Sequence, residues 1–391
     1  MSIIMYAIAV LVISRVAFLV LLRRFAPSPR RGSAAPSVSV VVPAYNESVT
    51  AVATVRNILS CGYPVAVLFV DDGSTDGTAD LVRSEFARDA RVKVLVKSNG
   101  GKAAAINTAI GVSTSEIIIT VDADTVLTPG SVERIVSWFE DPAIAAVAGH
   151  VEVGNRDSVV AALQHDEYVS AQSFERDALS RANGIMVVPG AFGAFRQSVV
   201  RKLGGYATDT LAEDCELTVR LVKAGYKVVY DRHAVAVTEA PDNMTAYIRQ
   251  RFRWGYGTAQ VLWKYRSLMF SRRFMGIVTM PYALVAGYLL PTIYPIIDFM
   301  LIFSIFTGNF IPPVVLILSS LLSYTVYMLM SGFGLADLHG IFARRALFRY
   351  VNTMVSLLVF RSILSGELVG WNKNRRTGIL NDRRLPDDKN R

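Results

Sequence analysis

Asp122-Ala123-Asp124 directly follows an apolar run and is the strongest local sign of chemistry in this chain of 391 residues. Two carboxylates with this spacing at a strand end can share one hard cation, or one can bind metal while the other binds a sugar hydroxyl. Mg²⁺ and Mn²⁺ prefer oxygen ligands, often one or two carboxylates plus substrate phosphates. Asp71-Asp72 follows another apolar run and can accept from a uracil imide N–H or a ribose hydroxyl. A turn role is the alternative for these pairs.

Glu213-Asp214 opens an apolar-periodic stretch that predicts a helix over 214–224. Acidic residues in a first turn interact favourably with the helix dipole, and this is the structural explanation. The functional explanation is a general base. Inverting glycosyl transfer needs one carboxylate to take the proton of the acceptor hydroxyl as C1 is attacked, while metal and arginine neutralise the departing nucleoside diphosphate.

A third group of candidates lies in the sequence Gln250-Arg251-Phe252-Arg253-Trp254. On a helix, Gln250, Arg253 and Trp254 share one face. An amide, a guanidinium and an indole facing a pocket suit a pyrophosphate and a sugar ring stacked on an aromatic. The alternative is an interfacial helix with a snorkelling arginine and a belt tryptophan. We assign Arg251 and Phe252 to that membrane role.

Apolar runs and helical patterns alternate along the first third of the chain and must position these residues. The sequence predicts strands at 38–42, 65–70, 91–96 and 116–121, and helices at about 49–60, 76–88 and 102–112. Another helix is predicted to begin at Pro129, with Thr128 as its cap. Strands separated by helices indicate a mostly parallel, doubly wound sheet, which binds ligands at the carboxyl ends of its strands. The polar motifs follow the strands at those ends.

Several familiar sites are excluded by particular residues. No G-x-G-x-x-G follows the first strand, and Ser98–Ala103 lacks the first glycine and the final Ser or Thr of a P-loop. The stretch Asp72–Gly77 resembles half a calcium loop, but its twelfth position is Arg83 rather than Glu. The four histidines have unrelated spacings, which argues against zinc.

The composition predicts a membrane protein with one large soluble domain. Hydrophobic residues make up 52% of the chain and charged residues 19%, with a mean hydropathy of +0.36. Residues 2–22 can span a bilayer, and the arginines that follow indicate an uncleaved anchor with its N-terminus outside. The runs 276–306 and 311–331 predict a membrane hairpin. The run 346–365 carries arginines, so we expect a helix in the cytosolic interface.

The positive charge gathers beside the apolar runs. The chain carries 41 basic and 32 acidic residues, and the stretch 249–273 holds seven basic residues and no acidic one. This distribution fits the positive-inside rule and anionic lipid headgroups, whereas a nucleic-acid partner is not expected because the remaining body is acidic. Arg15, inside the anchor, either snorkels to the cytosolic face or faces a polar conduit near Asp298. Glu167 is either an acceptor contact or a surface charge.

The ordered set PAYNE, DDGS, the Gly100-Gly101-Lys102 loop, DAD, ED and QRFRW resembles the processive family-2 glycosyltransferases, which include cellulose, chitin, hyaluronan and poly-N-acetylglucosamine synthases. The resemblance covers about residues 36–266. It implies a GT-A-type, Rossmann-like α/β sheet inserted between transmembrane and interfacial helices. The Q-x-x-R-W element separates processive synthases from single-transfer relatives.

The resemblance also implies roles for individual residues. In the uridine and phosphate pocket it places Tyr45, Glu47, Asp71, Asp72 and Lys102. It assigns UDP and Mg²⁺ or Mn²⁺ to Asp122 and Asp124, and general base catalysis to Asp214 beside Glu213. It assigns the pyrophosphate and acceptor site to Gln250, Arg253 and Trp254, the donor-sugar loop to Gly190 and Phe192, and a gating loop to Trp371 and Lys373. Ala212, where Thr is frequent, and Asn372, where Gly is usual, depart from the pattern.

We therefore expect four regions: an anchor and linker at 1–31, a cytosolic catalytic domain at 32–270, a membrane hairpin at 271–345, and an interfacial helix and basic tail at 346–391. The predicted function is a plasma-membrane, metal-dependent, inverting polymerase of a UDP-sugar, with UDP-N-acetylglucosamine the best donor. The growing glycan is the acceptor, and export needs a homo-oligomer or accessory subunit if three crossings are too few for a pore. The alternatives are single transfer to a polyprenyl phosphate or lipid, and a non-enzymatic nucleotide-binding regulator or transporter subunit.

Overall fold

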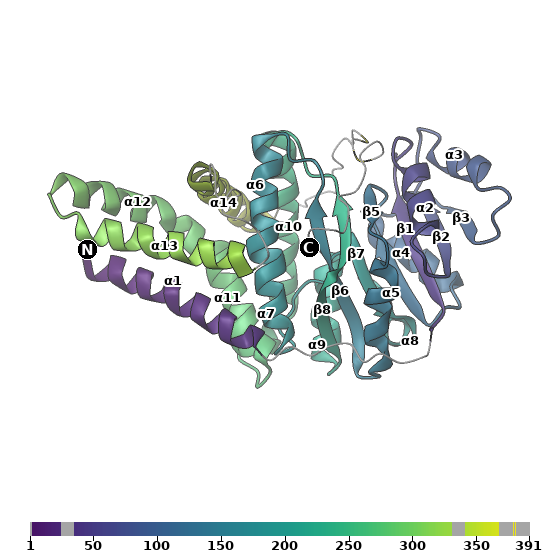
Figure 1. Ribbon diagram of the computed structural model, residues 1–391, viewed down its shortest axis with the longest axis horizontal. Helices are drawn as coiled ribbons and strands as arrows, with labels where there is room; N and C mark the ends of the chain where they lie inside the picture. The colour runs from purple at the N-terminus through teal and green to yellow at the C-terminus, as the bar shows by residue number, and fades with distance from the viewer. Residues whose placement is uncertain (1, 25–34, 331–340, 367–377, 379, 381–391) are drawn as a thin grey trace.

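The computed structural model describes residues 2–24, 35–330, 341–366, 378 and 380. Within these residues, one eight-stranded sheet is flanked by helices on both faces, and α1, α12 and α13 extend away from one side of this domain (Figure 1). The strands are β1 Val38–Ala44, β2 Val65–Asp71, β3 Val92–Val96, β4 Ile117–Val121, β5 Thr125–Leu127, β6 Ile144–Val153, β7 Phe192–Arg196 and β8 Lys227–Thr238.

The strand order is β3-β2-β1-β4-β7-β6-β8-β5. The β3-β2-β1-β4 part is parallel, as is the β6–β8 pair. Strand β7 runs antiparallel to both its neighbours, and β5 antiparallel to β8. The predicted mostly parallel α/β sheet is confirmed, and its antiparallel strands β5 and β7 lie where no strand was predicted.

The central strands are buried on both faces, which explains their continuous β-branched sequences. Along β1, Val41 contributes to one apolar cluster, while Val40 and Val42 contribute to another. Because side chains alternate across a strand, these clusters lie on opposite faces of the sheet. The first is covered mainly by helices α4 Lys102–Val112, α9 Glu213–Lys223 and α10 Met244–Lys264, and the second by α2 Ala51–Leu59 and α5 Ser131–Val136.

The remaining helices of the domain are short or interrupted. They include α3 Thr78–Glu85, α6 Val159–Glu167, a π-helical stretch Tyr168–Glu175, α7 Arg176–Ser180 and α8 Gln197–Lys202. Ser158 caps α6 by accepting from Ala161 N at 3.0 Å, and Asn243 caps α10 by accepting from Ala246 N at 2.9 Å.

The predicted helix start at Pro129 is wrong. Helix α5 begins at Ser131, and its N-cap is Gly130 with φ 74°, a left-handed conformation that glycine adopts readily. The Thr128 hydroxyl instead donates to Val235 O at 2.9 Å. Thr128 therefore ties the chain after β5 to β8, a long-range contact that local cap statistics do not reveal.

Among the residues that the structure describes, three helical segments are long and apolar enough to cross a membrane: Ser2–Arg23, Met275–Phe306 and Ala346–Ser365. Met275–Phe306 includes π-helical turns and the helices α11 Met280–Leu284 and α12 Leu290–Phe306. A turn at 307–310 leads into α13 Ile311–Met330, which packs beside α1 Ser2–Arg23 (Figure 1). The predicted helical hairpin is present.

The last helix, α14 Ile341–Ser365, packs against α10 and α12. Arg349 donates to Asp298 Oδ1 at 2.7 Å, and the Thr353 hydroxyl donates to Pro291 O at 2.7 Å. Asp298 therefore pairs with Arg349 of this last helix. The interfacial placement of this helix stays a prediction, because its length and composition also permit a span.

Four acidic residues on the helical stretch 159–180 pair with arginines from three other helices, and we call this set the docking row. Its pairs are Asp166–Arg344 of α14, Glu167–Arg251 of α10, and Glu175–Arg15 and Asp177–Arg23 of α1. Arg15 also donates to the Tyr327 hydroxyl at 2.9 Å. Arg15 thus does not snorkel freely, because it joins α1 to the domain and to α13, and a polar conduit near Asp298 stays a prediction.

Candidate active site

The parallel strand order β2-β1-β4 brings three polar strand ends to one edge of the sheet. Ala44 is in register with Asp71, and Asp72 N donates to Ala44 O at 2.8 Å. Antiparallel β7 pairs Val121 with Phe192. The residues just before β7 therefore lie beside Asp122, which directly follows β4. This topology places the predicted motifs next to one another.

The loops after β1 and β2 are joined by side-chain hydrogen bonds. Asn46, with φ 52°, accepts from Thr75 N at 2.8 Å and donates its own N–H to Ser74 Oγ at 2.8 Å. Glu47 is buried, and its backbone N–H donates to Thr78 Oγ1 at 2.9 Å. Tyr45 is half-buried in the same loop. The predicted nucleoside residues thus lie on a rigid double loop.

Asp71 and Asp72 have different surroundings. Asp71 Oδ1 accepts from the backbone N–H groups of Gly73 at 3.0 Å and Ser74 at 2.8 Å, while its buried Oδ2 has no hydrogen-bond partner. A buried carboxylate oxygen without a donor is unfavourable, so it suits a donor from outside the chain, such as an imide N–H. Direct binding by Asp71 stays a prediction that this geometry favours.

The carboxylate of Asp72 supports the glycine loop instead. It accepts from Gly101 N at 2.7 Å and Gly100 N at 3.0 Å, and from Lys97 Nζ at 2.6 Å. These contacts fix the backbone immediately before Lys102. Asp72 is 3% exposed, so its observed role is to position this loop, and its predicted contact with substrate stays untested.

Lys102, at the start of α4, lies between the end of β4 and the start of α9. Its ammonium group is paired with Asp122. Burial alone lowers the pKa of an amine, but the Asp122, Glu213 and Asp214 carboxylates raise the pKa of Lys102 above its ordinary value. Lys102 is therefore a fixed cation among carboxylates, placed to neutralise a phosphate.

Gly190 lies against both Lys102 and Asp214. Its backbone N–H donates to Asp214 Oδ2 at 3.3 Å, and a Cβ here would lie 2.6 Å from Lys102 Nζ. The second carboxylate oxygen of Asp214 accepts from Cys215 N at 2.7 Å in the first turn of α9. These contacts orient the Asp214 carboxylate toward the strand end that carries Asp122.

Glu213 and Arg253 extend the cluster toward α10. Burial and the Asp214 carboxylate raise the pKa of Glu213, against the lowering effect of Lys102 and Arg253. We call Lys102, Asp122, Glu213, Asp214 and Arg253 the catalytic cluster. It holds three carboxylates and two basic groups, so it is electronegative before any ligand binds.

On α10, Gln250 and Trp254 lie one turn apart. The amide oxygen of Gln250 is buried without a hydrogen-bond partner, whereas Trp254 is half-buried against the apolar cluster that also contacts Ala191. Arg251, between them in sequence, is 5% exposed and paired with Glu167. The prediction that Arg251 snorkels in the membrane interface is wrong, because its guanidinium is inside the domain.

A family model described as "Glycosyltransferase like family 2" matches residues 35–257, more than half of the chain. The chain belongs to this family. Its members transfer sugars, so this chain is a family-2 glycosyltransferase, and the strand-end cluster is its candidate active site.

Two curated relatives are poly-beta-1,6-N-acetyl-D-glucosamine synthases of staphylococci. That of Staphylococcus aureus (strain COL) is 28% identical over 240 residues, 61% of this chain and 58% of its own length. That of Staphylococcus epidermidis is 30% identical over 228 residues, 58% of this chain and 55% of its own length. Each match thus spans little more than half of either protein.

Among solved structures, a mannosyltransferase from Pyrobaculum calidifontis in complex with GDP-Man and Mn²⁺ has a TM-score of 0.61 and 21% identity. The match covers 93% of this chain and 100% of that chain. At this identity the likeness shows the fold, which is of GT-A type.

The donor set of this glycosyltransferase fits a hard divalent cation. Asp122 and Asp124 both follow β4, and Asp124 Oδ1 accepts from the hydroxyls of Thr125 at 3.3 Å and Thr238 at 3.4 Å. No group of three His, Cys, Asp or Glu side chains among the described residues could hold a metal. Two carboxylates therefore suit Mg²⁺ or Mn²⁺ only if a diphosphate and water supply the other ligands.

Some predicted residues are not in the site. Phe192 is fully buried, and its ring lies against Gly149, so the predicted donor contact is corrected to a packing role. Trp371 and Lys373 lie outside the described residues. Beyond them, Gly378 N donates to Glu239 Oε2 at 3.2 Å, next to the Thr238 that contacts Asp124.

Two residues that contribute to the site were missed from the sequence. Lys97 directly follows β3 and pairs with Asp72, so the rule of strand carboxyl ends was sufficient to find it. Thr238 ends β8 and contacts Asp124. It gave no signal, because the β8 strand itself was not predicted.

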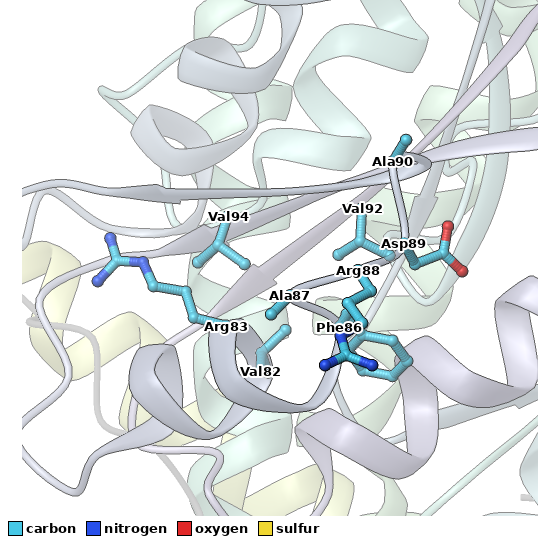
Figure 2. A pocket seen from close by; sticks show the side chains of 9 residues that line it. All are labelled: Val82, Arg83, Phe86, Ala87, Arg88, Asp89, Ala90, Val92 and Val94. Carbon is cyan, nitrogen blue, oxygen red and sulfur yellow. The ribbon is translucent and has the colours of Figure 1, made fainter.

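A cavity of about 380 Å³ opens between α3 and β3 (Figure 2). Its wall includes Val82, Phe86, Val92 and Val94, with Arg88 and Asp89 at the connecting loop. Val92 and Val94 belong to the early part of β3, whereas the polar motifs follow strand ends. This cavity is therefore separate from the catalytic cluster.

Proposed function

We propose that this family-2 glycosyltransferase is a membrane-embedded, inverting, processive polysaccharide synthase that uses a UDP-sugar and Mg²⁺ or Mn²⁺. The observation that carries the proposal is the meeting of Asp122, Lys102, Gly190 and Asp214 at one end of the sheet. Arg253 and Trp254 lie on the helix that borders this cluster. A diphosphate, an anomeric carbon and an acceptor hydroxyl each have a suitable group there.

In the proposed reaction, the acceptor hydroxyl oxygen attacks C1 of the donor sugar from the side opposite UDP. The C1–O bond to the diphosphate breaks, and its electron pair leaves with UDP. Asp214 takes the hydroxyl proton, a general-base role worth about 10²–10⁴-fold. Lys102 and Arg253 bind the charge that develops on the diphosphate. A divalent cation held by Asp122 and Asp124 would supply further neutralisation.

UDP-N-acetylglucosamine is the proposed donor. The proposal is supported by the staphylococcal relatives, whose printed names specify an N-acetylglucosamine polymer. The unpartnered Asp71 Oδ2 is also compatible with a uracil imide N–H. Trp254 is proposed to stack on the acceptor sugar, which keeps the glycan end in place between successive transfers.

We further propose a multi-pass plasma-membrane protein with a cytosolic catalytic domain. Arg23 at the end of α1 supports this orientation by the positive-inside rule. The domain boundaries 1–31, 32–270, 271–345 and 346–391 are part of the proposal, with Trp371 and Lys373 in a gating loop. Export of the product through few helices is proposed to involve a second copy or an accessory subunit.

The test is UDP release by the purified chain in lipid nanodiscs, with the product sized in the same samples. Donors are UDP-glucose, UDP-galactose, UDP-glucuronate and UDP-N-acetylglucosamine, each with Mg²⁺ or Mn²⁺. The proposal expects release with UDP-N-acetylglucosamine and a long polymer digestible by an N-acetylglucosaminidase. Release that requires an added polyprenyl phosphate, without polymer, would establish the single-transfer alternative instead.

A further inference from the structure

We propose that Glu167, Arg251 and Tyr247 form a support that fixes the indole of Trp254, which makes Arg251 a positioning residue for the acceptor glycan. This inference rests on the proposed function, because that proposal places Trp254 at the acceptor. It assigns a role in acceptor binding to residues that do not face the catalytic cluster themselves.

The geometry of Arg251 carries the inference. Its guanidinium carbon lies 4.4 Å from the centroid of the Trp254 ring and 4.6 Å from that of Tyr247. A cation at such distances is attracted by the negative face of an aromatic ring, and the attraction is greater in desolvated sites. Arg251 is 5% exposed, so this contact is shielded from water.

Glu167 holds the guanidinium in place from the other helix. Its Oε2 lies 2.6 Å from Arg251 Nη2, an ion pair by distance that lacks the angles of a hydrogen bond. The same Oε2 accepts from the Tyr247 hydroxyl at 3.3 Å. Glu167 is the last residue of α6, and the π-helical stretch begins at the next residue. Both alternatives for Glu167, acceptor contact and surface charge, are thus replaced by an internal ion pair.

We expect that lysine could not replace Arg251 in this support. A planar guanidinium can stack on two rings while its edge pairs with a carboxylate, whereas a lysine ammonium is a point charge on a flexible chain. Tyr247, Arg251 and Trp254 follow one another at helical spacing, so one face of α10 holds the whole arrangement. A misplaced indole would weaken acceptor binding, because small displacements of a binding group lower rates strongly.

The test compares Arg251→Met, Arg251→Lys and the double variant Arg251→Met/Glu167→Gln, which avoids leaving a buried carboxylate unpaired. Arg249→Met is the matched control, since Arg249 is exposed on the same helix. The 391-residue protein in nanodiscs is assayed with UDP-N-acetylglucosamine and a short β-linked N-acetylglucosamine oligosaccharide. Folding of each variant is checked by its melting temperature.

Arg251→Met and the double variant should raise the KM for the oligosaccharide about tenfold, equivalent to about 1.4 kcal/mol, and shorten the polymer. Hydrolysis of the donor without acceptor should stay within about twofold of the wild type, because the catalytic cluster is intact. Arg251→Lys should fall between wild type and Arg251→Met. A folded double variant with normal oligosaccharide KM and polymer length would overturn the proposal.

Tryptophan fluorescence tests the contact between Arg251 and Trp254 independently of the proposed function. The emission of Trp254 is obtained as the difference between each protein and the same protein carrying Trp254→Phe. Arg251→Met should shift this emission to longer wavelength and increase its quenching by acrylamide, and Arg249→Met should not. An unchanged emission overturns the support itself. A wild-type protein that transfers no sugar overturns the proposed function, and the emission then decides alone whether Arg251 fixes Trp254.

Discussion

The catalytic cluster and the docking row use the same kinds of side chain in opposite ways. In the docking row, each of the four acidic residues has an arginine partner from another helix. In the catalytic cluster, Lys102 pairs with Asp122, and Arg253 is the one other basic group beside the carboxylates of Glu213 and Asp214. One region is electrically balanced, and the other is electronegative.

This difference in charge balance indicates that the docking row holds the structure together and that the catalytic cluster binds substrate. Balanced, buried pairs join α1, α10 and α14 to the stretch 159–180 and leave no charge for a ligand. An excess of carboxylates repels a diphosphate unless a cation enters with it. The charge balance of the two regions therefore predicts that ligands bind at the catalytic cluster and that substitutions in the docking row lower stability. The Glu167–Arg251 pair is the exception, because Arg251 also contacts Trp254.

Removal of divalent metal is expected to have the largest effect. Protein dialysed against EDTA should lose all detectable sugar transfer, because the catalytic cluster then repels the donor diphosphate. Added Mg²⁺ or Mn²⁺ should restore it, while the melting temperature should hardly change, since the docking row needs no ion. The measurement is UDP release before and after chelation. Undiminished transfer by protein shown to be metal-free by elemental analysis would contradict the assignment of Asp122 and Asp124.

Asp214→Asn should lower turnover by about 10²–10⁴-fold, a typical general-base contribution. UDP binding should be retained, because the amide preserves the shape of the side chain and Lys102 is unchanged. Turnover is measured by UDP release and binding by calorimetry. Asp209→Asn is the control, since Asp209 is 65% exposed and pairs with Lys264 outside the cluster. Equal turnover of the two variants would contradict the assignment of Asp214 as the general base.

Asp177→Asn should act on stability alone. It leaves Arg23 and Arg181 facing a neutral amide, and loss of one partner of a buried pair lowers the free energy of unfolding by about 3–5 kcal/mol. Turnover per folded molecule should match the wild type. Denaturant unfolding in detergent measures the change. Glu85→Gln breaks the exposed pair with Arg56 and should shift unfolding by only about 0–1 kcal/mol. Similar shifts for both would remove the distinction between buried and surface pairs.

Much of the sheet could be predicted from local sequence. The four parallel strands and the helices at 51–59 and 102–112 lie within a few residues of the predicted ranges, because continuous β-branched runs and helical periodicity are local signals. The second half of the sheet could not be predicted. Strands β6, β7 and β8 pair across long stretches of chain, and their register depends on packing rather than on turns.

The predictions for single residues differ in the same way between local signals and long-range packing. Asp122, Lys102 and Asp214 were found from their motifs, and the structure brings them together. Phe192 belongs to a motif as well, but its side chain points into the core. A motif specifies which residues are near a site, whereas the alternation of a strand decides which of them reach it.

The sequence by itself determined the polar strand ends, the apolar helical hairpin and the set of motifs that marks a family-2 glycosyltransferase. Each of these features depends on residues that are consecutive or regularly spaced in the sequence. Only the tertiary structure decided that Arg251 lies against Trp254 and pairs with Glu167, and that Arg15 binds Glu175. The physical reason is that a charged side chain is buried only where a distant partner offsets its desolvation, and no local pattern identifies that partner.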